Sequence, residues 1–87
     1  MGNKELAKDL LELGKFYFFN EKYDEAIRVL QKSVKFDPSL AETYYNLGLI
    51  YEAKNENIKA KEMHLKALEA DPKFKCAQER VNRLVGT

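Results

Sequence analysis

Apolar residues recur at steps of three and four positions along most of this chain, which is the spacing of amphipathic helices. In the first stretch these residues are Leu6, Leu10, Leu13 and Tyr17. A second stripe consists of Tyr23, Ala26, Ile27, Leu30 and Val34, and a late one of Ala77, Val81, Leu84 and Val85. The pattern predicts an all-α protein in which one side of each helix faces a shared core.

Polar turns and prolines divide this pattern into five predicted helices. Asp37 and Asp71 each precede a proline, which disfavours helical geometry at the aspartate. The turns fall at residues 20–22 and 55–57, and the helices at 4–19, 23–36, 40–54, from the second turn to 70, and 74–85. Asn3 is the expected N-cap of the first helix, and Ser39 with Glu42 has the form of a capping box.

The chain also repeats itself at a fixed interval of 34 residues. The repeated pairs are Leu10 and Tyr44, Leu13 and Leu47, Gly14 and Gly48, Tyr17 and Tyr51, Ala26 and Ala60, Asp37 and Asp71, and Pro38 and Pro72. A single fixed period is normally the mark of stacked supersecondary units rather than of one globular core with an active site. The period therefore favours a docking surface over an enzyme.

Small residues within the predicted helices point to close helix packing. Glycine inside a helix costs about 1 kcal/mol relative to alanine, so its recurrence at one phase implies a packing reason. Gly14 and Gly48, facing Ala26 and Ala60, would let two antiparallel helices approach closely. We expect bulky side chains to fill the space beside these contacts.

These positions together resemble the tetratricopeptide repeat, a 34-residue helix–turn–helix unit with a W-x2-L-G-x2-Y, A-x3-F, P pattern. The copies read Leu10, Leu13, Gly14, Tyr17, Ala26, Leu30, Pro38 and Tyr44, Leu47, Gly48, Tyr51, Ala60, His64, Pro72. The resemblance covers residues 7–40 and 41–74, and 75–85 is similar to the helix that commonly closes such arrays, within a single domain over 4–87. It implies an α-α superhelix, a right-handed solenoid of five helices. His64 departs from the pattern, which usually has a large apolar ring there, and neither turn within a repeat contains glycine.

Proteins of this family are usually non-enzymatic adaptors whose A helices, the first of each pair, line a concave groove for a peptide or a helix. Carried over by position, the implied groove residues are Lys8, Leu11, Glu12, Lys15, Phe18, Glu42, Tyr45, Asn46, Leu49, Glu52, Cys76, Glu79, Arg80 and Arg83. Leu11, Tyr45 and Leu49 are apolar beyond what the helix pairs need, as a peptide site requires. The alternative is that they pack between repeats or against the last helix.

The resemblance also bears on the ligand. In several family members an asparagine at the place of Asn46 bonds the peptide backbone. Of the residues that clamp chaperone tails in one subclass, only Asn46 and Arg80 are matched, so that ligand is poorly supported. Residues 73–87 carry a charge of +3, and Arg80 and Arg83 facing Lys8 and Lys15 would suit an acidic peptide. Solvated charge is the alternative explanation for each of them.

No catalytic or metal-binding set is evident. His64 is the only histidine and Cys76 the only cysteine, which is too few ligands for a metal and leaves no orienting partner for a base. There is no glycine-rich phosphate loop, and we expect no cofactor. We interpret His64 as a packed residue, and Cys76 as incidental, with a modifiable thiol near the binding surface as the alternative.

The run from Phe16 to Phe19 is too apolar for one helix to bury. Four consecutive residues cover the whole circumference, so if Phe16 and Tyr17 face the interior, Phe18 or Phe19 should be exposed, covered by a partner or used in self-association. A structural unit that oligomerises by stacking or swapping its terminal helices is thus the alternative to a peptide-binding adaptor.

Composition narrows the partners further. The 87 residues carry a net charge of +1, which gives no support to nucleic-acid or membrane-surface binding. There is no apolar run of membrane-spanning length and no apolar leader, and one cysteine fits a reducing compartment. We therefore expect a cytosolic protein whose partner is a protein or peptide.

Overall fold

Five α-helices and no strand make up residues 2–85, which the computed structural model describes. The helices are α1 (Asn3–Phe19), α2 (Tyr23–Phe36), α3 (Ala41–Ala53), α4 (Asn57–Ala70) and α5 (Lys75–Leu84). The predicted helices are confirmed, with ends that agree to within one residue. The molecule measures 42 × 28 × 16 Å, as expected for helices stacked in sequence.

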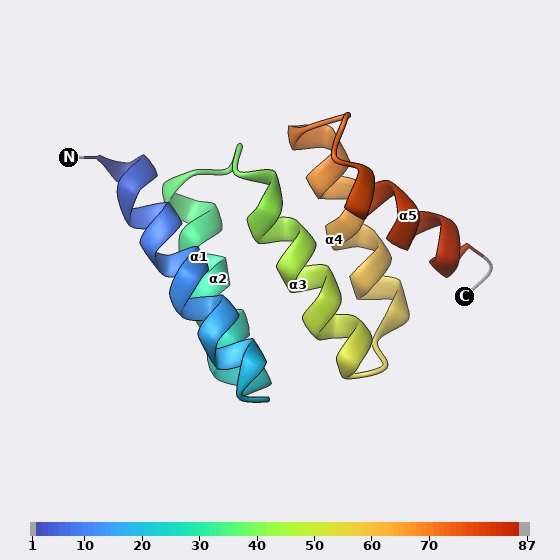
Figure 1. Cartoon of the computed structure of the whole chain (residues 1–87), viewed down its shortest axis with the longest axis horizontal. Helices are drawn as coiled ribbons and strands as arrows, with labels where there is room; N and C mark the ends of the chain where they lie inside the picture. The colour runs from blue at the N-terminus through green and yellow to red at the C-terminus, as the bar shows by residue number, and fades with distance from the viewer. Residues whose placement is uncertain (1, 86–87) are drawn as a thin grey trace.

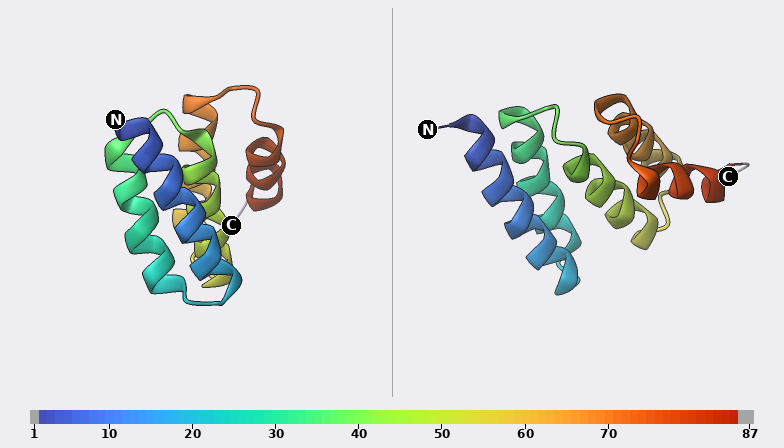
Figure 2. Two further views of the ribbon diagram at one scale, coloured as in Figure 1. Left: turned by 60° about the vertical axis from the view of Figure 1, so that its left-hand side comes forward. Right: turned by 45° about the horizontal axis from the view of Figure 1, so that its top comes forward.

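The helices form two antiparallel pairs and a closing helix. Helix α1 packs on α2 and α3 packs on α4, while α2 and α1 contact α3 and join the pairs (Figure 1). Helix α5 packs against α4, at the opposite end of the molecule from α1 (Figure 1). The right-hand view of Figure 2 shows α1, α3 and α5 following one another along one side. The predicted groove residues all belong to these three helices.

The two turns inside the helix pairs share one backbone form. Glu21 and Asn55 lie 34 residues apart and have positive φ angles of 60° and 63°. After α1, the Lys22 N–H donates to the Tyr17 carbonyl at 2.9 Å, and after α3 the Glu56 N–H donates to the Tyr51 carbonyl at 2.8 Å. This is the Schellman ending, which usually has glycine where these two residues stand.

The predicted N-caps are wrong. Helix α1 begins at Asn3 with Gly2 as its cap, and α3 begins after Leu40, neither with a side-chain capping bond. The backbone N–H and hydroxyl of Ser39 donate instead to Oδ1 of Asp37, at 3.0 and 2.6 Å. These bonds hold the turn before α3 and lower the pKa of Asp37 below its usual value.

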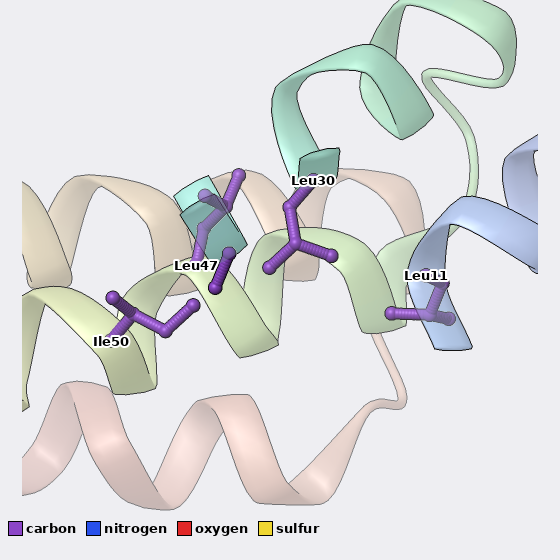
Figure 3. Packing of buried hydrophobic residues seen from close by; sticks show 5 residues of the cluster. Leu11, Leu30, Leu47 and Ile50 are labelled. Carbon is purple, nitrogen blue, oxygen red and sulfur yellow. The ribbon is translucent and has the colours of Figure 1, made fainter. Parts of the chain in front are cut away.

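The core runs through both pairs. Leu30 of α2 and Ile50 of α3 are fully buried, and Leu11 and Leu47 are 3% exposed (Figure 3). On α1 the buried residues are Ala7, Leu11 and Gly14. The sequence stripe on α1 was therefore assigned to the wrong face, since its Leu6 and Leu13 are 47% and 41% exposed. Leu11, which is not part of the predicted stripe, is the α1 residue that is buried in one cluster with Leu47 and Ile50 of α3.

Buried hydroxyls link three helices beside this core. Ser33 of α2 donates its hydroxyl proton to the carbonyl of Ala7 on α1 at 2.8 Å. The Ser33 oxygen lies 3.1 Å from Oγ1 of Thr43 on α3, and both side chains are fully buried. Because Ser33 has one proton, Thr43 must be the donor in this second bond. The three helices are thus fixed by a polar chain with each member satisfied.

Helix α5 covers the end of the second pair. Ala77 is fully buried, and Val81 and Leu84 are 9% and 7% exposed, as the late stripe predicts. Val85 was predicted on the same side but is 65% exposed, because the helix ends at Leu84 and the backbone becomes extended. The apolar side of α5 therefore completes the core around Ala67 and Phe74.

Candidate functional site: the A-helix face

The predicted groove residues divide into three groups by burial. Lys8, Glu12, Cys76, Glu79 and Arg83 are exposed; Lys15, Phe18, Glu42, Tyr45, Leu49, Glu52 and Arg80 are half-buried; Leu11 and Asn46 are buried. The exposed and half-buried members on α1, α3 and α5, together with Phe19, are called the A-helix face below. Two cross-helix ion pairs show that this surface is continuous from α1 to α5.

The first pair joins α1 to α3. Nζ of Lys15 lies 3.0 Å from Oε2 of Glu42 and 3.5 Å from Oε2 of Glu12. The bond to Glu42 is the main cause that raises the pKa of Lys15 above its usual value. Lys15 was predicted as a free cation for an acidic ligand, but two carboxylates of the same face already neutralise it.

The second pair joins α3 to α5. The guanidinium of Arg80 donates to both carboxylate oxygens of Glu52, with Nε 3.1 Å from Oε2 and Nη2 on Oε1. This bidentate geometry is the strong form of an ion pair. Burial alone would raise the pKa of Glu52, but bonds from Arg80 and then His64 bring it below the usual value. Arg80 thus links α5 to α3 of the second repeat.

His64 of α4 completes this cluster from the inside. Its ring is fully buried, and Nε2 lies 2.8 Å from Oε2 of Glu52. Since a carboxylate only accepts, Nε2 carries the proton, and the unpartnered Nδ1 is the bare nitrogen of a neutral ring. Burial lowers the pKa of His64 despite the neighbouring carboxylate. Our interpretation of His64 as a packed residue is confirmed by this burial.

Tyr45 packs into the same region and is not a free groove residue. Its ring centroid lies 5.4 Å from that of His64 and 5.3 Å from that of Phe74, the latter nearly edge-on. Burial raises the pKa of Tyr45, with the Cys76 thiol as the next contribution. The ring therefore belongs mainly to the contact of α3 with α4 and with the segment before α5.

Leu11 and Asn46 are corrections to the predicted groove. Leu11 is 3% exposed in the core between α1 and α3, so it offers no apolar surface to a ligand. Asn46 is 7% exposed, and its amide donates to the carbonyl of Glu42 one turn earlier at 2.9 Å. One of the two N–H donors of the Asn46 amide is therefore used inside α3, and burial limits access to the other.

Phe19 was not among the predicted groove residues, yet it is the most exposed aromatic side chain that the structure describes. It is 87% exposed, and it follows Lys8, Glu12 and Lys15 at steps of four, three and four along α1. That spacing was a usable signal in the sequence. Phe18 instead packs in the core beside Tyr23, at 6.0 Å between ring centroids.

Phe16 is a further correction to the analysis of the aromatic run. It was assigned to the helix interior but is 61% exposed. Tyr17 is half-buried as expected. The expectation that Phe18 or Phe19 is exposed is confirmed by Phe19 alone.

The described residues hold no group of three or more histidine, cysteine, aspartate or glutamate side chains that could bind a metal ion. Cys76 is exposed on α5. Among the helices over residues 2–85, none is long and apolar enough to cross a membrane.

Two family profiles match the chain in overlapping register. One, described as TPR repeat, matches residues 14–55, and the other, described as tetratricopeptide repeat, matches residues 41–74. The chain belongs to the tetratricopeptide repeat family. Members of this family are generally non-catalytic interaction modules, in agreement with the surface described above.

Two curated relatives are similar over most of this chain. The uncharacterized protein ycf37 of Guillardia theta is 35% identical over 65 residues, which is 75% of this chain and 36% of the relative. The protein SLOW GREEN 1, chloroplastic, of Arabidopsis thaliana is 31% identical over 80% of this chain and 22% of its own length. The chain therefore spans about a third or less of these relatives.

Solved structures with the same fold include two named proteins. MamA matches with a TM-score of 0.86 and 29% identity, over 90% of this chain and 46% of that one. The second TPR of Spaghetti (RPAP3), bound to an HSP90 peptide, matches with a TM-score of 0.89 and 22% identity, over 94% of this chain and 76% of that one. The predicted helical-repeat fold is confirmed by these matches.

Proposed function

We propose that this tetratricopeptide repeat chain is a non-catalytic module that binds a peptide or helix of a partner protein along the A-helix face. The observation that carries the proposal is that this face presents Phe19, which is 87% exposed, and half-buried Leu49 among charged side chains. Apolar side chains within a polar rim are the usual anchors of a recognition site.

The ligand that we propose is mainly apolar. The sequence analysis suggested an acidic peptide, but Lys15 is paired with Glu42 and Arg80 with Glu52. Breaking either pair would leave a carboxylate without its partner, which offsets what a new acidic group could gain. Lys8 and Arg83 remain as exposed cations that can orient such a ligand.

The test begins with peptides selected from a random display library against the purified chain. Affinity is then measured by calorimetry for the unmodified chain, Phe19→Ala and Leu49→Ala. We expect each variant to lose about tenfold or more in affinity, as for anchor residues in general. The matched control is Ile58→Ala, because Ile58 is also exposed, at 70%, but lies at the start of α4. Equal affinities in all four proteins would contradict the proposal.

Self-association through α1 is the second candidate function. Leu13 and Phe16 are 41% and 61% exposed, whereas Leu47 and Ile50, 34 residues later, are 3% and 0% exposed because α1 and α2 cover them. A second copy could cover the same face of α1 in the same manner. Sedimentation over a hundredfold concentration range tests this, with Phe16→Glu as the variant that should abolish any dimer and a constant monomer mass as the contrary result.

The compartment is also a proposal. The sequence led us to expect a cytosolic protein, but the name of one relative assigns that protein to the chloroplast. We propose a plastid or cytosolic location, to be decided by fractionation of the source cells with an antibody against the chain. Recovery with neither fraction would reject both.

A further inference from the structure

Residues of α3 and of the B helices, α2 and α4, line a hollow that contains none of the residues of the A-helix face. Both helices pack on α3 and have little direct contact with each other, so a furrow remains between them. Its volume is about 420 Å³, within the range of about 300–1,000 Å³ that is typical of binding pockets. No feature of the A-helix face uses this furrow.

The floor of the furrow is apolar. Val34 comes from α2, Tyr44 and Tyr51 from α3, and Met63 from α4, and all four are half-buried. Tetratricopeptide-like packing between the pairs therefore leaves accessible carbon surface here rather than closing it. Methionine in such a floor can adapt to side chains of different shape.

The rim of the furrow carries one sign of charge. Lys35 and Lys66 flank it, from α2 and α4, and Gln31 is the remaining polar residue of the lining. Within residues 2–85 neither lysine has an ion-pair partner, in contrast to Lys15 and Lys54. Two unpaired cations beside an apolar floor favour a ligand with carboxylates beside an apolar side chain.

A neighbouring hollow of about 570 Å³ shares Tyr44 and Lys66 with the furrow. This hollow also contains Asp37 and Glu69, but Asp37 already accepts both bonds from Ser39. Only Glu69 is an exposed carboxylate there. The positive end of the surface thus lies at Lys35, and the carboxylates of a ligand should lie nearer to Lys35 than to Glu69.

We propose that the furrow between α2 and α4 is a second docking site, which takes a partner segment with a large apolar side chain flanked by acidic residues. The apolar side chain would lie on Val34 and Met63, and the carboxylates would lie against Lys35 and Lys66. A site on this side would let the chain hold two partners at once, because the A-helix face remains free.

The test uses a fluorescently labelled synthetic peptide with a central phenylalanine between aspartates. Anisotropy at low salt should show saturable binding, and the affinity should fall at least tenfold in the double variant Lys35→Glu/Lys66→Glu and also as salt is raised. The matched control is Lys73→Glu/Lys75→Glu, which changes the net charge equally at exposed lysines outside the furrow and should bind within about twofold of the unmodified chain. Circular dichroism checks that both double variants remain helical.

Amide shift mapping locates the peptide. Shifts should change at Val34, Met63 and Lys66, and not at Phe19 or Leu49. Three results would overturn the proposal: shifts confined to the A-helix face, an equal loss in the control double variant, or undiminished binding when alanine replaces the peptide phenylalanine. A chain mass that rises with concentration, and does not in Lys35→Glu/Lys66→Glu, would assign the furrow to a second copy and overturn the peptide assignment.

Discussion

Gly48 lies against the ring of His64, so closely that a Cβ atom added to the glycine would come within 2.3 Å of Cε1. The first repeat has the same arrangement, with Gly14 at 2.3 Å from a methyl carbon of Leu30 by the same measure. A helical glycine therefore admits the bulky residue of the partner helix in both repeats. His64 stands where the first repeat has the apolar Leu30. Its ring nitrogen Nε2 is satisfied there by the hydrogen bond to Glu52.

The contact predicts that Gly48→Ala destabilises the fold. Overpacking of a core costs about 1–3 kcal/mol, and we expect the upper part of this range, about 2–3 kcal/mol, because the added Cβ would lie 2.3 Å from Cε1. The better helix propensity of alanine returns about 1 kcal/mol, so we expect a net loss of about 1–2 kcal/mol. Urea denaturation measures this loss. In the control Gly2→Ala the new Cβ would meet nothing closer than 3.5 Å, so the only expected cost is that alanine caps α1 less well than glycine, about 0.5 kcal/mol and less than for Gly48→Ala. If Gly48→Ala were as stable as the parent, the tight contact would be refuted.

Stability should fall in two steps as the pH is lowered. The pKa of His64 is below 6.5 in the fold, so the unfolded chain takes up the proton first and stability is lost as the pH falls below about 6.5. The pKa of Glu52 is below 4.5, so its contribution is present above that pH and is lost below it. Thermal melts from pH 7.5 to 3.5 should show both steps.

The variant His64→Leu separates the two steps. His64 is the only histidine, and Leu30 shows that leucine fits the equivalent place in the first repeat. We expect the upper step, which begins below about pH 6.5, to vanish in this variant while the step below 4.5 persists through Glu52 and Arg80. Retention of the upper step would show that another group causes it.

The fold was predictable because its determinants are local or periodic. The 34-residue period, the prolines after Asp37 and Asp71, and the helical spacing together specify five helices and their order. The phase of α1 was not predicted, because apolar residues surround that helix and the contact with α3 decides which of them are buried. Ala7 and Gly14, the small residues in register with Leu11, were the signal that marked the buried side.

The candidate site was less predictable than the fold. Residue types on the A-helix face followed from the resemblance, but Glu52, His64 and Arg80 come from three different helices, and no spacing in the sequence indicates that they meet. Arg80 and Lys15 were therefore expected to be free cations. The furrow between α2 and α4 could not be predicted from the sequence either, because it depends on how far apart the two helix pairs pack.

The buried hydroxyl chain predicts a coupled effect. Ser33→Ala would leave the Thr43 proton and the Ala7 carbonyl without this partner, at a cost of about 1–3 kcal/mol. Thr43→Val alone removes one donor and leaves Ser33 bonded to Ala7, so its cost should be smaller. In the double variant Ser33→Ala/Thr43→Val the losses should be less than additive, which a urea-denaturation cycle measures. Strict additivity would mean that the two hydroxyls do not interact.

The left-handed turn residues predict a stabilising change. A side chain at positive φ costs about 1–2 kcal/mol relative to glycine, and asparagine tolerates this region better than glutamate does. After allowing for the greater freedom of glycine in the unfolded chain, we expect Glu21→Gly to stabilise by about 0.5–1 kcal/mol. Asn55→Gly is the matched control and should gain less. Loss of stability in Glu21→Gly would contradict the shared turn geometry.

The ion pair of Glu52 with Arg80 predicts that α5 is held by charge as well as by apolar packing. Arg80→Ala would leave a carboxylate that is only 17% exposed with His64 as its remaining partner, and we expect a loss of about 1.5–3 kcal/mol, typical of bonds to charged groups. Glu52→Gln keeps the shape and removes the charge, so the combined variant should lose less than the sum of the two single losses. Arg83→Ala is the control, since Arg83 is exposed in the last turn of the same helix, and should cost less than about 0.5 kcal/mol. Hydrogen exchange of the α5 amides reports where the loss acts: Arg80→Ala should accelerate exchange in α5 more than in α1. Equal acceleration in both helices would show that the pair supports the whole array rather than the closing helix.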